Sequence, residues 1–348
     1  SAKNAARRVR FFCCFLPLEL CENTLTANTE TAIMKDVKNG RCRGAGIRCR
    51  TVGKLRIPKE NIMKTEMYML TETSEFMMSF VIVTKKNNVI VVDGGRQEDM
   101  PLLKQYVGGR HIAAWILTHA HSDHIGGFVE EMRQNGGADF DIGAIYYNFP
   151  DYDSLILKTD VPDLPYFREE LNEMLPAFNA VKGAFADKAH IVHAGDRCTV
   201  DEVNIEFLYA YRDGLYANLM NDASLVFKLS GEKKSVIFLG DLGPDGGDRL
   251  FREKKDELKA DYCQMAHHGH MNVSMEVYAK ILPEACFWCA PKWLYEEPEI
   301  PSYLADGVTL EKAGRIRMYG TALTRHWMEL LGVKTHYVSG FGTCKVEI

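Results

Sequence analysis

Residues 118–127 read THAHSDHIGG, a run that places three imidazoles and one carboxylate within six positions. A single histidine is ordinarily a structural residue, but neutral imidazole is also the commonest metal ligand among side chains. The clustering of His119, His121, Asp123 and His124 therefore predicts metal binding. We expect His119 and His121 to serve one ion, and Asp123 and His124 to serve a neighbouring one.

The residues around this run predict a strand followed by a helix. The apolar segment 113–118 has the pattern of a buried strand. The first two histidines follow it at the i, i+2 spacing that lets extended side chains point the same way. Gly126 and Gly127 are expected to open a helix over 128–134, which the Asn-Gly-Gly sequence 135–137 ends. The ligands then lie on a strand-to-helix loop, where catalytic groups often lie.

Strands and helices alternate along the rest of the chain, and several neighbouring strands have hairpin-length connections. This pattern predicts a mixed-sheet sandwich with helices outside. The expected strands are 75–83, 88–92, 144–148, 189–193, 204–209, 224–229 and 235–239. The expected helices are 100–106 and 167–185, the second broken or kinked at Pro176.

Composition and charge narrow the class of protein. The 348 residues are 46% hydrophobic and 26% charged, an ordinary globular composition, and no apolar stretch reaches the ~20 residues of a membrane span. Residues 1–62 hold 13 Lys/Arg and 5 Asp/Glu, a charge of +8; the rest holds 42 − 13 = 29 basic and 47 − 5 = 42 acidic residues, or −13. The acidic main part argues against duplex nucleic acid as a partner. It allows a small anionic substrate, because bound cations dominate the field inside a site.

The first 62 residues differ from the rest in their hydrophobic pattern. They show no steady hydrophobic period, and we expect residues 1–62 to be a poorly ordered or accessory extension and 63–348 to form the functional domain. Their segment 7–16 resembles the start of a signal peptide, but Pro17 and Glu19 follow it without a clean cleavage site. The ten cysteines suit a reducing compartment better than a disulfide framework. We therefore expect a cytoplasmic protein and leave its oligomeric state open.

Two further strand ends carry candidate metal ligands. Asp241 follows the apolar strand 235–239, and a carboxylate can bridge two cations ~3.5–4 Å apart. A second strand, from 262, runs into His267 and His268. His267 is expected to be the ligand because it comes first off that strand. His268 is the alternative ligand, or contacts the substrate as an acid or hydrogen-bond donor.

Together these residues resemble the metallo-β-lactamase superfamily over roughly 63–348. The run 119–124 matches its HxHxDH motif, Asp241 matches its bridging aspartate, and the final histidine corresponds to His267 or His268. The resemblance implies an α/β fold, a four-layer αββα sandwich with the site along one edge of the sheets. Within that family, a strand-end aspartate equivalent to Asp93 supports the ligand loop.

A narrower resemblance concerns the branch that contains the ComEC-type hydrolase domain and the choline-phosphate esterases. It is carried by NDASLV at 221–226, FLGD at 238–241 and AHHG at 266–269. The family's middle histidine ligand is commonly missing in that branch, and this chain has no imidazole where it is expected. Asn221, Asp222 or a water molecule would take its place. This departure argues against a typical β-lactamase.

The resemblance implies a metal-dependent hydrolase that uses a metal-bound hydroxide. One or two Zn²⁺ ions suit the imidazole-rich ligands, with manganese or iron as alternatives. Asp123 is expected to bind metal and to orient or deprotonate the water, and His268 to assist the leaving group. The expected substrate is a small or short phosphoester, above all a phosphodiester. The alternatives are a lactone, thioester or β-lactam, or a metal-binding module with little turnover.

Overall fold

The structure, a computed structural model, describes residues 64–153, 172–212, 218–296 and 320–348. These belong to one unit that runs from Lys54 to Ile348. The expectations for residues 1–62, and for the first part of the helix expected over 167–185, lie outside the described residues.

The first sheet has eight strands among the described residues. Their order is β15-β1-β2-β3-β4-β6-β7, and β5 pairs with β4. The β1–β2 and β2–β3 pairs are antiparallel, whereas β3–β4, β4–β6 and β6–β7 are parallel. The strands are β1 Glu66–Met69, β2 Ser79–Val83, β3 Val89–Asp93, β4 His111–Ile116, β5 Asp141–Ile142, β6 Ile145–Tyr147, β7 Ala189–Ile191 and β15 Cys344–Glu347.

The second sheet has seven strands in the described part, in the order β14-β13-β12-β11-β10-β9-β8. Its β8 to β11 strands are antiparallel, and β11 to β14 are parallel. The strands are β8 Arg197–Val200, β9 Val203–Tyr209, β10 Val226–Ser230, β11 Ser235–Phe238, β12 Tyr262–Gln264, β13 Ala285–Trp288 and β14 Thr335–Val338.

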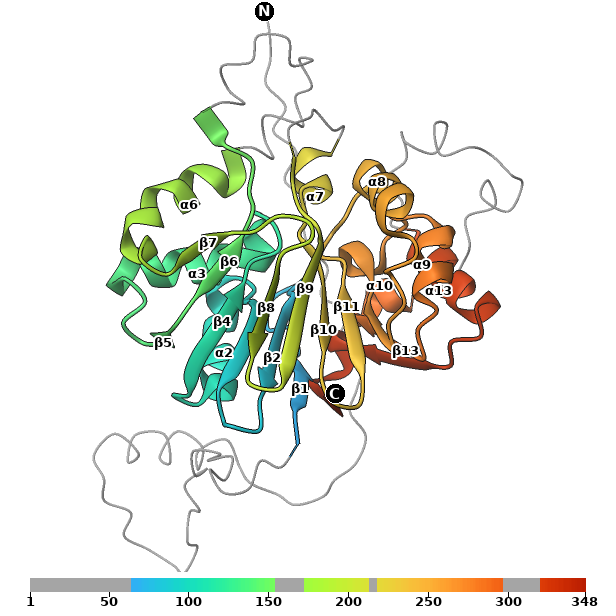
Figure 1. Cartoon of the computed structure of the whole chain (residues 1–348), viewed down its shortest axis with the longest axis horizontal. Coiled ribbons are helices and arrows are strands. Elements are labelled where there is room, and N and C mark those ends of the chain that lie inside the picture. Colours follow the sequence, from blue (N-terminus) through green and yellow to red (C-terminus); the bar gives the residue numbers. More distant parts are fainter. Residues whose placement is uncertain (1–63, 154–171, 213–217, 297–319) are drawn as a thin grey trace, which may run out of the picture. The chain divides into compact units, whose positions relative to one another are not determined.

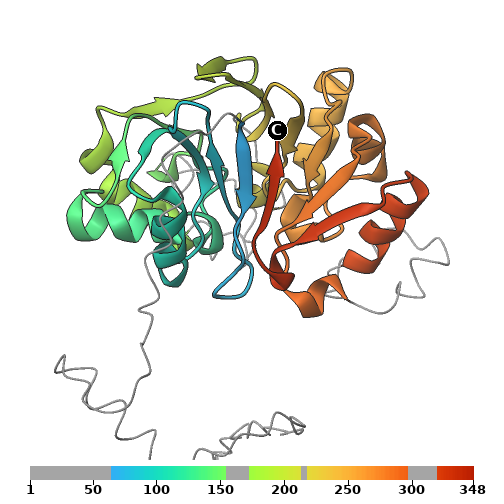
Figure 2. The same cartoon turned by 90° about the horizontal axis from the view of Figure 1, so that it is seen from below.

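Helices cover the outer face of each sheet (Figures 1 and 2). The first sheet packs against α2 Met100–Val107, α3 Ser122–Asn135 and α6 Leu175–Val181. The second packs against α8 Pro244–Lys254, α9 Met275–Ile281 and α13 Thr321–Leu330. The short elements are η1 Gln97–Asp99, η2 Lys182–Phe185, α7 Leu219–Asp222, η3 Ala266–Gly269, α10 Lys292–Tyr295 and η4 Ser339–Phe341.

Three hydrophobic clusters define the layers. One lies between the two sheets, where Phe80 of β2 meets Phe238 of β11 and Phe287 of β13 with ring centroids 5.0 and 5.9 Å away. The other two lie between each sheet and its own helices. Burying both faces of each sheet in this way produces the four layers, and it confirms the predicted αββα sandwich.

The helix after the histidine run begins earlier than predicted. It starts at Ser122, so Gly126 and Gly127 lie inside α3 and do not open it. A Cβ atom on Gly127 would lie 2.5 Å from Met100 Sδ and 2.8 Å from the Arg96 carbonyl oxygen. The glycine therefore lets α3 approach the η1–α2 segment closely. Pro176 was predicted to break or kink a helix over 167–185. In the structure it lies in the first turn of α6, which begins at Leu175, and its missing N–H has no cost there.

Candidate metal centre

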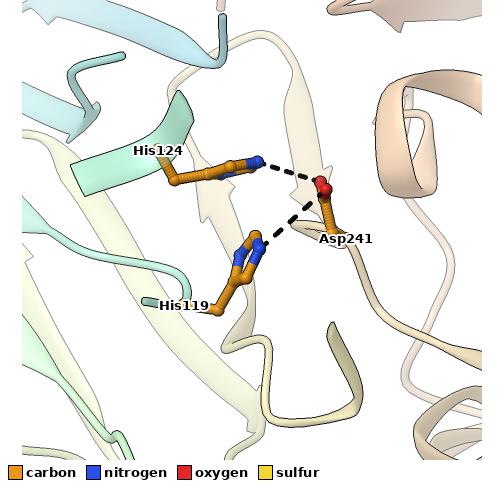
Figure 3. Close-up of side chains that lie close together, drawn as sticks. All are labelled: His119, His124 and Asp241. Atoms are coloured by element: carbon orange, nitrogen blue, oxygen red, sulfur yellow. Dashed lines mark ion pairs between the residues drawn. The ribbon is translucent and has the colours of Figure 1, made fainter. Parts of the chain in front are cut away.

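The candidate ligands lie just beyond the ends of strands from both sheets. Asp93 is the last residue of β3, and the histidine run follows β4. Asp241 follows β11, and the histidine pair follows β12. Because the sheets pack face to face, the strand ends of one lie opposite those of the other. Figure 3 shows His119 and His124 from the first sheet's side directed at Asp241 from the second.

Asp93 holds the ligand loop in place. Its Oδ1 accepts the backbone N–H of Thr118 at 2.8 Å, and its Oδ2 accepts the Thr118 hydroxyl at 2.7 Å. Oδ2 also lies 2.7 Å from Nδ1 of His124. A carboxylate on Nδ1 fixes the ring and turns Nε2 inward, as is usual for metal-binding histidines. The supporting role that the resemblance implied for Asp93 agrees with these contacts.

Asp241 lies at the centre of the cluster and is almost wholly buried. Its Oδ1 is 3.2 Å from His124 Nε2. Its Oδ2 is 3.2 Å from His268 Nε2 and 3.9 Å from His119 Nε2 (Figure 3 draws the contacts with His124 and His119). One carboxylate therefore faces imidazoles from three directions, which is the arrangement expected of a bridging ligand.

Asp123 and His268 form a second part of the cluster. Asp123 Oδ2 lies 3.0 Å from His268 Nε2 and 4.0 Å from His124 Nε2. Two groups of donor atoms within 4.8 Å of one another result: His119, His124 and Asp241, and Asp123, His124 and His268. His124 is common to both groups, so the two candidate positions are adjacent.

Several donor atoms of the cluster lack hydrogen-bond partners in the described part of the chain, as expected of atoms that bind a divalent metal. Four of them are buried without a hydrogen-bond partner among the described residues: His121 Nε2, His124 Nε2, Asp241 Oδ1 and His268 Nε2. His124 Nε2 and Asp241 Oδ1 are only 3.2 Å apart, yet they lack hydrogen-bond geometry. Buried donor atoms that lie close together without forming hydrogen bonds to one another are what a metal site requires. Imidazole and carboxylate donors fit Zn²⁺ and other first-row cations.

Charge within the cluster is balanced by protons when no metal is bound. Burial alone lowers the pKa of His124, but Asp241, Asp123 and Asp93 together raise it well above the usual range. Burial likewise opposes protonation of His268, yet Asp241 and Asp123 raise its pKa to about 10. Burial works against ionisation of Asp241, but His124 and His268 hold its pKa well below the ordinary value. A metal must displace these protons, so its affinity rises with pH.

His267 and His268 occupy different positions, although they are adjacent in the chain. His268 is 3% exposed and belongs to the group with Asp123. His267 is 24% exposed, its Nε2 is 3.8 Å from Asp241 Oδ2, and it belongs to neither donor group. Of the two, the geometry therefore favours His268 as the ligand. The expectation that His267 binds metal because it leaves the strand first is not supported by these positions.

His121 and the region that lacks the family's middle histidine lie outside both donor groups. His121 is the N-cap of α3, and its Nδ1 lies 3.1 Å from His119 Nε2. In the region that lacks the family's middle histidine, Asp222 directs Oδ1 to the backbone N–H of Gly246, at 2.8 Å. Burial raises the pKa of Asp222 to about 7. Asp222 thus contacts the start of α8, and this contact leaves Asn221 or water as the candidate to replace the histidine.

Two residues that the sequence did not single out position Asp241. Gln264 accepts the backbone N–H groups of Leu239 and Gly240, both at 2.8 Å, and donates to the Gly240 carbonyl at 3.1 Å. Ser224 Oγ accepts the backbone N–H of Asp241 at 3.0 Å. A sequence signal for Gln264 was available. It is an amide in an otherwise apolar strand, and a buried polar side chain such as this needs hydrogen-bond partners.

Comparison with known proteins agrees with this fold. Residues 76–163 match the family model described as the Metallo-beta-lactamase superfamily. No curated protein matches the chain. The metallo-beta-lactamase fold protein YhfI from Bacillus subtilis is 12% identical, with a TM-score of 0.45 over 81% of this chain and 100% of its own.

Two further solved structures show the same general similarity. CmlA, a diiron beta-hydroxylase from Streptomyces venezuelae, is 10% identical, with a TM-score of 0.46 over 82% of this chain and 54% of that chain. A putative metal-dependent hydrolase from Parabacteroides distasonis is 13% identical, with a TM-score of 0.41 over 75% and 89%.

The layered fold and the histidine–aspartate donor set agree with the resemblance to the metallo-β-lactamase superfamily. The match to the metallo-β-lactamase superfamily model covers residues 76–163, which include the histidine run. Among the helices of the described residues, none combines the length and apolarity needed to cross a membrane.

Proposed function

We propose that this chain is a metal-dependent phosphoesterase, with a phosphodiester as the preferred substrate class. The observation that carries the proposal is the absence of an imidazole from residues 219–222, where the resemblance places the family's middle histidine. Asp123, His124 and His268 form one donor group. An ion beside His119 and His121 would therefore have one imidazole fewer than the family provides. Such an ion would have more room for substrate oxygens, and a phosphodiester offers two non-bridging ones. The chain's resemblance to the ComEC-type and choline-phosphate esterase branch supports the same class.

The residues that would hold metal divide into two sets. Asp123, His124 and His268 would hold the first ion, and His119 and His121 the second, with Asp241 between them. Zn²⁺ suits this donor set, and Mn²⁺ or iron is the alternative. A metal bound here supplies Lewis acidity and lowers the pKa of water toward ~7.

The remaining roles follow from the positions of the side chains. Asp123 is 13% exposed, so its carboxylate is positioned to orient a water molecule and accept its proton. Asp93 keeps His124 oriented through Nδ1. His268 is fully engaged within the cluster, so the leaving-group role expected of it passes to the more exposed His267. A small or short substrate suits this arrangement.

Two other functions remain as alternatives. A lactone, thioester or β-lactam would be attacked at carbon with the same residues. A metal-binding module with little turnover would use the same donors, Asp123 included, and the substrate panel separates it from an enzyme.

The test combines metal analysis with a substrate panel. Purified protein is loaded with Zn²⁺, Mn²⁺ or Fe²⁺ and assayed with bis-p-nitrophenyl phosphate, a lactone and nitrocefin. We expect metal-dependent turnover of the phosphodiester and its loss in Asp123→Asn, which keeps the side-chain shape but cannot accept a proton. Turnover of the carbon substrates alone would refute the phosphoesterase proposal. Bound metal without turnover on any substrate would favour the binding module.

A further inference from the structure

The turn that follows β12 brings a distant amide back onto His267. His267 and His268 both have positive φ, at 49° and 57°, a conformation that side-chain-bearing residues rarely adopt twice in succession. The backbone N–H of His270 then donates to the His267 carbonyl at 2.8 Å, and that of Asn272 donates to His270 at 2.9 Å. This tight return places the Asn272 side chain beside the His267 ring.

The orientation of the Asn272 amide is determined by its two partners. Its Nδ2 lies 3.1 Å from the backbone carbonyl oxygen of Asp241 and 2.8 Å from His267 Nδ1. A carbonyl oxygen only accepts, so the amide nitrogen, and not its oxygen, must face Asp241. The same nitrogen then has one hydrogen left, and this hydrogen points at His267 Nδ1.

His267 Nδ1 must therefore accept a hydrogen bond and carries no hydrogen. The neutral ring holds its single proton on Nε2, which faces the cluster 3.8 Å from Asp241 Oδ2. A protonated Nε2 has no lone pair for a metal. His268 shows the opposite arrangement, because its Nδ1 donates to the Cys289 carbonyl oxygen at 2.7 Å and leaves Nε2 for the cluster.

We infer that Asn272 is a positioning residue that keeps His267 in the Nε2–H form, so that His267 donates a hydrogen bond to a substrate oxygen and does not bind metal. The tautomer assignment stands on the hydrogen bonds alone. The substrate contact rests on the proposed function, and the two parts are tested separately.

The tautomer is tested first on metal-free protein, independently of any activity. Long-range proton–nitrogen correlation spectra of protein with ¹⁵N-labelled histidine, recorded at about pH 8 where an ordinary histidine is neutral, identify the protonated nitrogen of each ring. The His267→Gln variant assigns the His267 signals. We expect the Nε2–H pattern in the wild type and a shift toward Nδ1–H in Asn272→Asp, whose carboxylate accepts. An Nδ1–H pattern in the wild type would overturn the inference.

A matched control separates the tautomer from simple loss of anchoring. Asn272 also bonds the Asp241 carbonyl, so its replacement removes a contact to that segment. Ser224→Ala removes the other such contact, from Ser224 Oγ to the Asp241 N–H, without touching His267. We expect Ser224→Ala to retain the wild-type His267 pattern. The same tautomer change in Ser224→Ala as in Asn272→Asp would overturn a specific role for Asn272.

The substrate contact is tested by a double-mutant cycle on phosphodiester turnover. We expect Asn272→Asp to lower kcat at least about 10-fold, because loss of one oriented donor in an active site commonly costs more than this. Glutamine at position 267 provides an N–H donor whichever residue stands at 272. In the His267→Gln background, Asn272→Asp should therefore have a much smaller effect. Equal effects in both backgrounds would refute the coupling; absence of phosphodiester turnover would refute the proposed function and leave the tautomer result standing.

Discussion

Nδ1 of His268 lies 2.7 Å from the carbonyl oxygen of Cys289, so it donates to that carbonyl and directs Nε2 into the cluster. Nε2 is then 3.0 Å from Asp123 and 3.2 Å from Asp241. A metal-binding histidine is normally held in this way, with its second nitrogen donating to a carbonyl or carboxylate. This relationship distinguishes His268 from its neighbour and leads to the first prediction.

His268→Gln should lose metal, whereas His267→Gln should keep it. The two variants are matched in substitution and in sequence position, and they differ only in which imidazole is removed. We expect metal affinity to fall by at least about 100-fold in the first variant and by less than about 10-fold in the second. The metal content per chain, measured after dialysis against increasing concentrations of chelator, tests this prediction. The reverse order would restore His267 as the ligand.

Asp241→Asn should reduce binding at both positions at once. Its Oδ1 faces His124 and its Oδ2 faces both His268 and His119, so it contacts members of both sets of residues that would hold metal. We expect the number of ions bound per chain to approach zero. Asp248→Asn, the same change at an exposed position of α8, serves as the control. An unchanged stoichiometry in Asp241→Asn would show that this residue is not a bridge.

Asp93→Asn should weaken metal binding without removing a ligand. The carboxylate accepts from Thr118 twice and from His124 Nδ1. An amide nitrogen in place of Oδ2 cannot accept, so the His124 ring loses its orientation. Changes to such supporting residues typically cost about 10–100-fold in metal affinity. Competition titration with a chromogenic chelator measures this loss, and wild-type affinity would contradict the role.

Much of the metal centre was predictable because its first half is contiguous in the sequence. Four donors in the run 119–124 need only a strand end and one helical turn to converge, and the strand patterns around them are strong. Asp241 follows a strand in the same way. The resemblance then supplied the pairing of the two sheets, which no local pattern determines.

The features of the site that the sequence did not predict depend on backbone conformation and on contacts between residues distant in the chain. The order in which His267 and His268 face the cluster follows from two successive left-handed residues, and their sequence does not reveal that conformation. Asn272 and Gln264 act through hydrogen bonds to the backbone near Asp241. The start of α3 was misplaced because a Gly-Gly pair usually marks a turn, whereas here Gly127 permits close packing.

Asp222→Asn should change how stability depends on pH. Burial raises the pKa of Asp222 to about 7 in the folded protein, against about 3.9 in an unfolded chain. Between these values the folded state keeps a proton that the unfolded state has released, so stability falls as pH rises through this window. The amide variant lacks this decline and should gain stability relative to the wild type, by up to a few kcal/mol, between pH ~5 and ~8. Urea unfolding of the metal-free wild type and variant at both pH values measures this gain. The same pH dependence of stability in the two proteins would contradict the raised pKa of Asp222.

Gly127→Ala and Gly126→Ala should have opposite effects on stability, although both add one methyl group inside α3. At Gly127 the new Cβ would meet Met100 Sδ at 2.5 Å and the Arg96 carbonyl oxygen at 2.8 Å, and the backbone oxygen cannot move aside without shifting the η1–α2 segment. Overpacking of this kind costs about 1–3 kcal/mol. At Gly126 the nearest atom, Arg96 Cα, is 3.6 Å away, an ordinary contact, so alanine's helix propensity should stabilise by up to about 1 kcal/mol. Thermal unfolding of the two variants tests the pair: similar shifts would mean that Gly127 is not required for the close approach of α3.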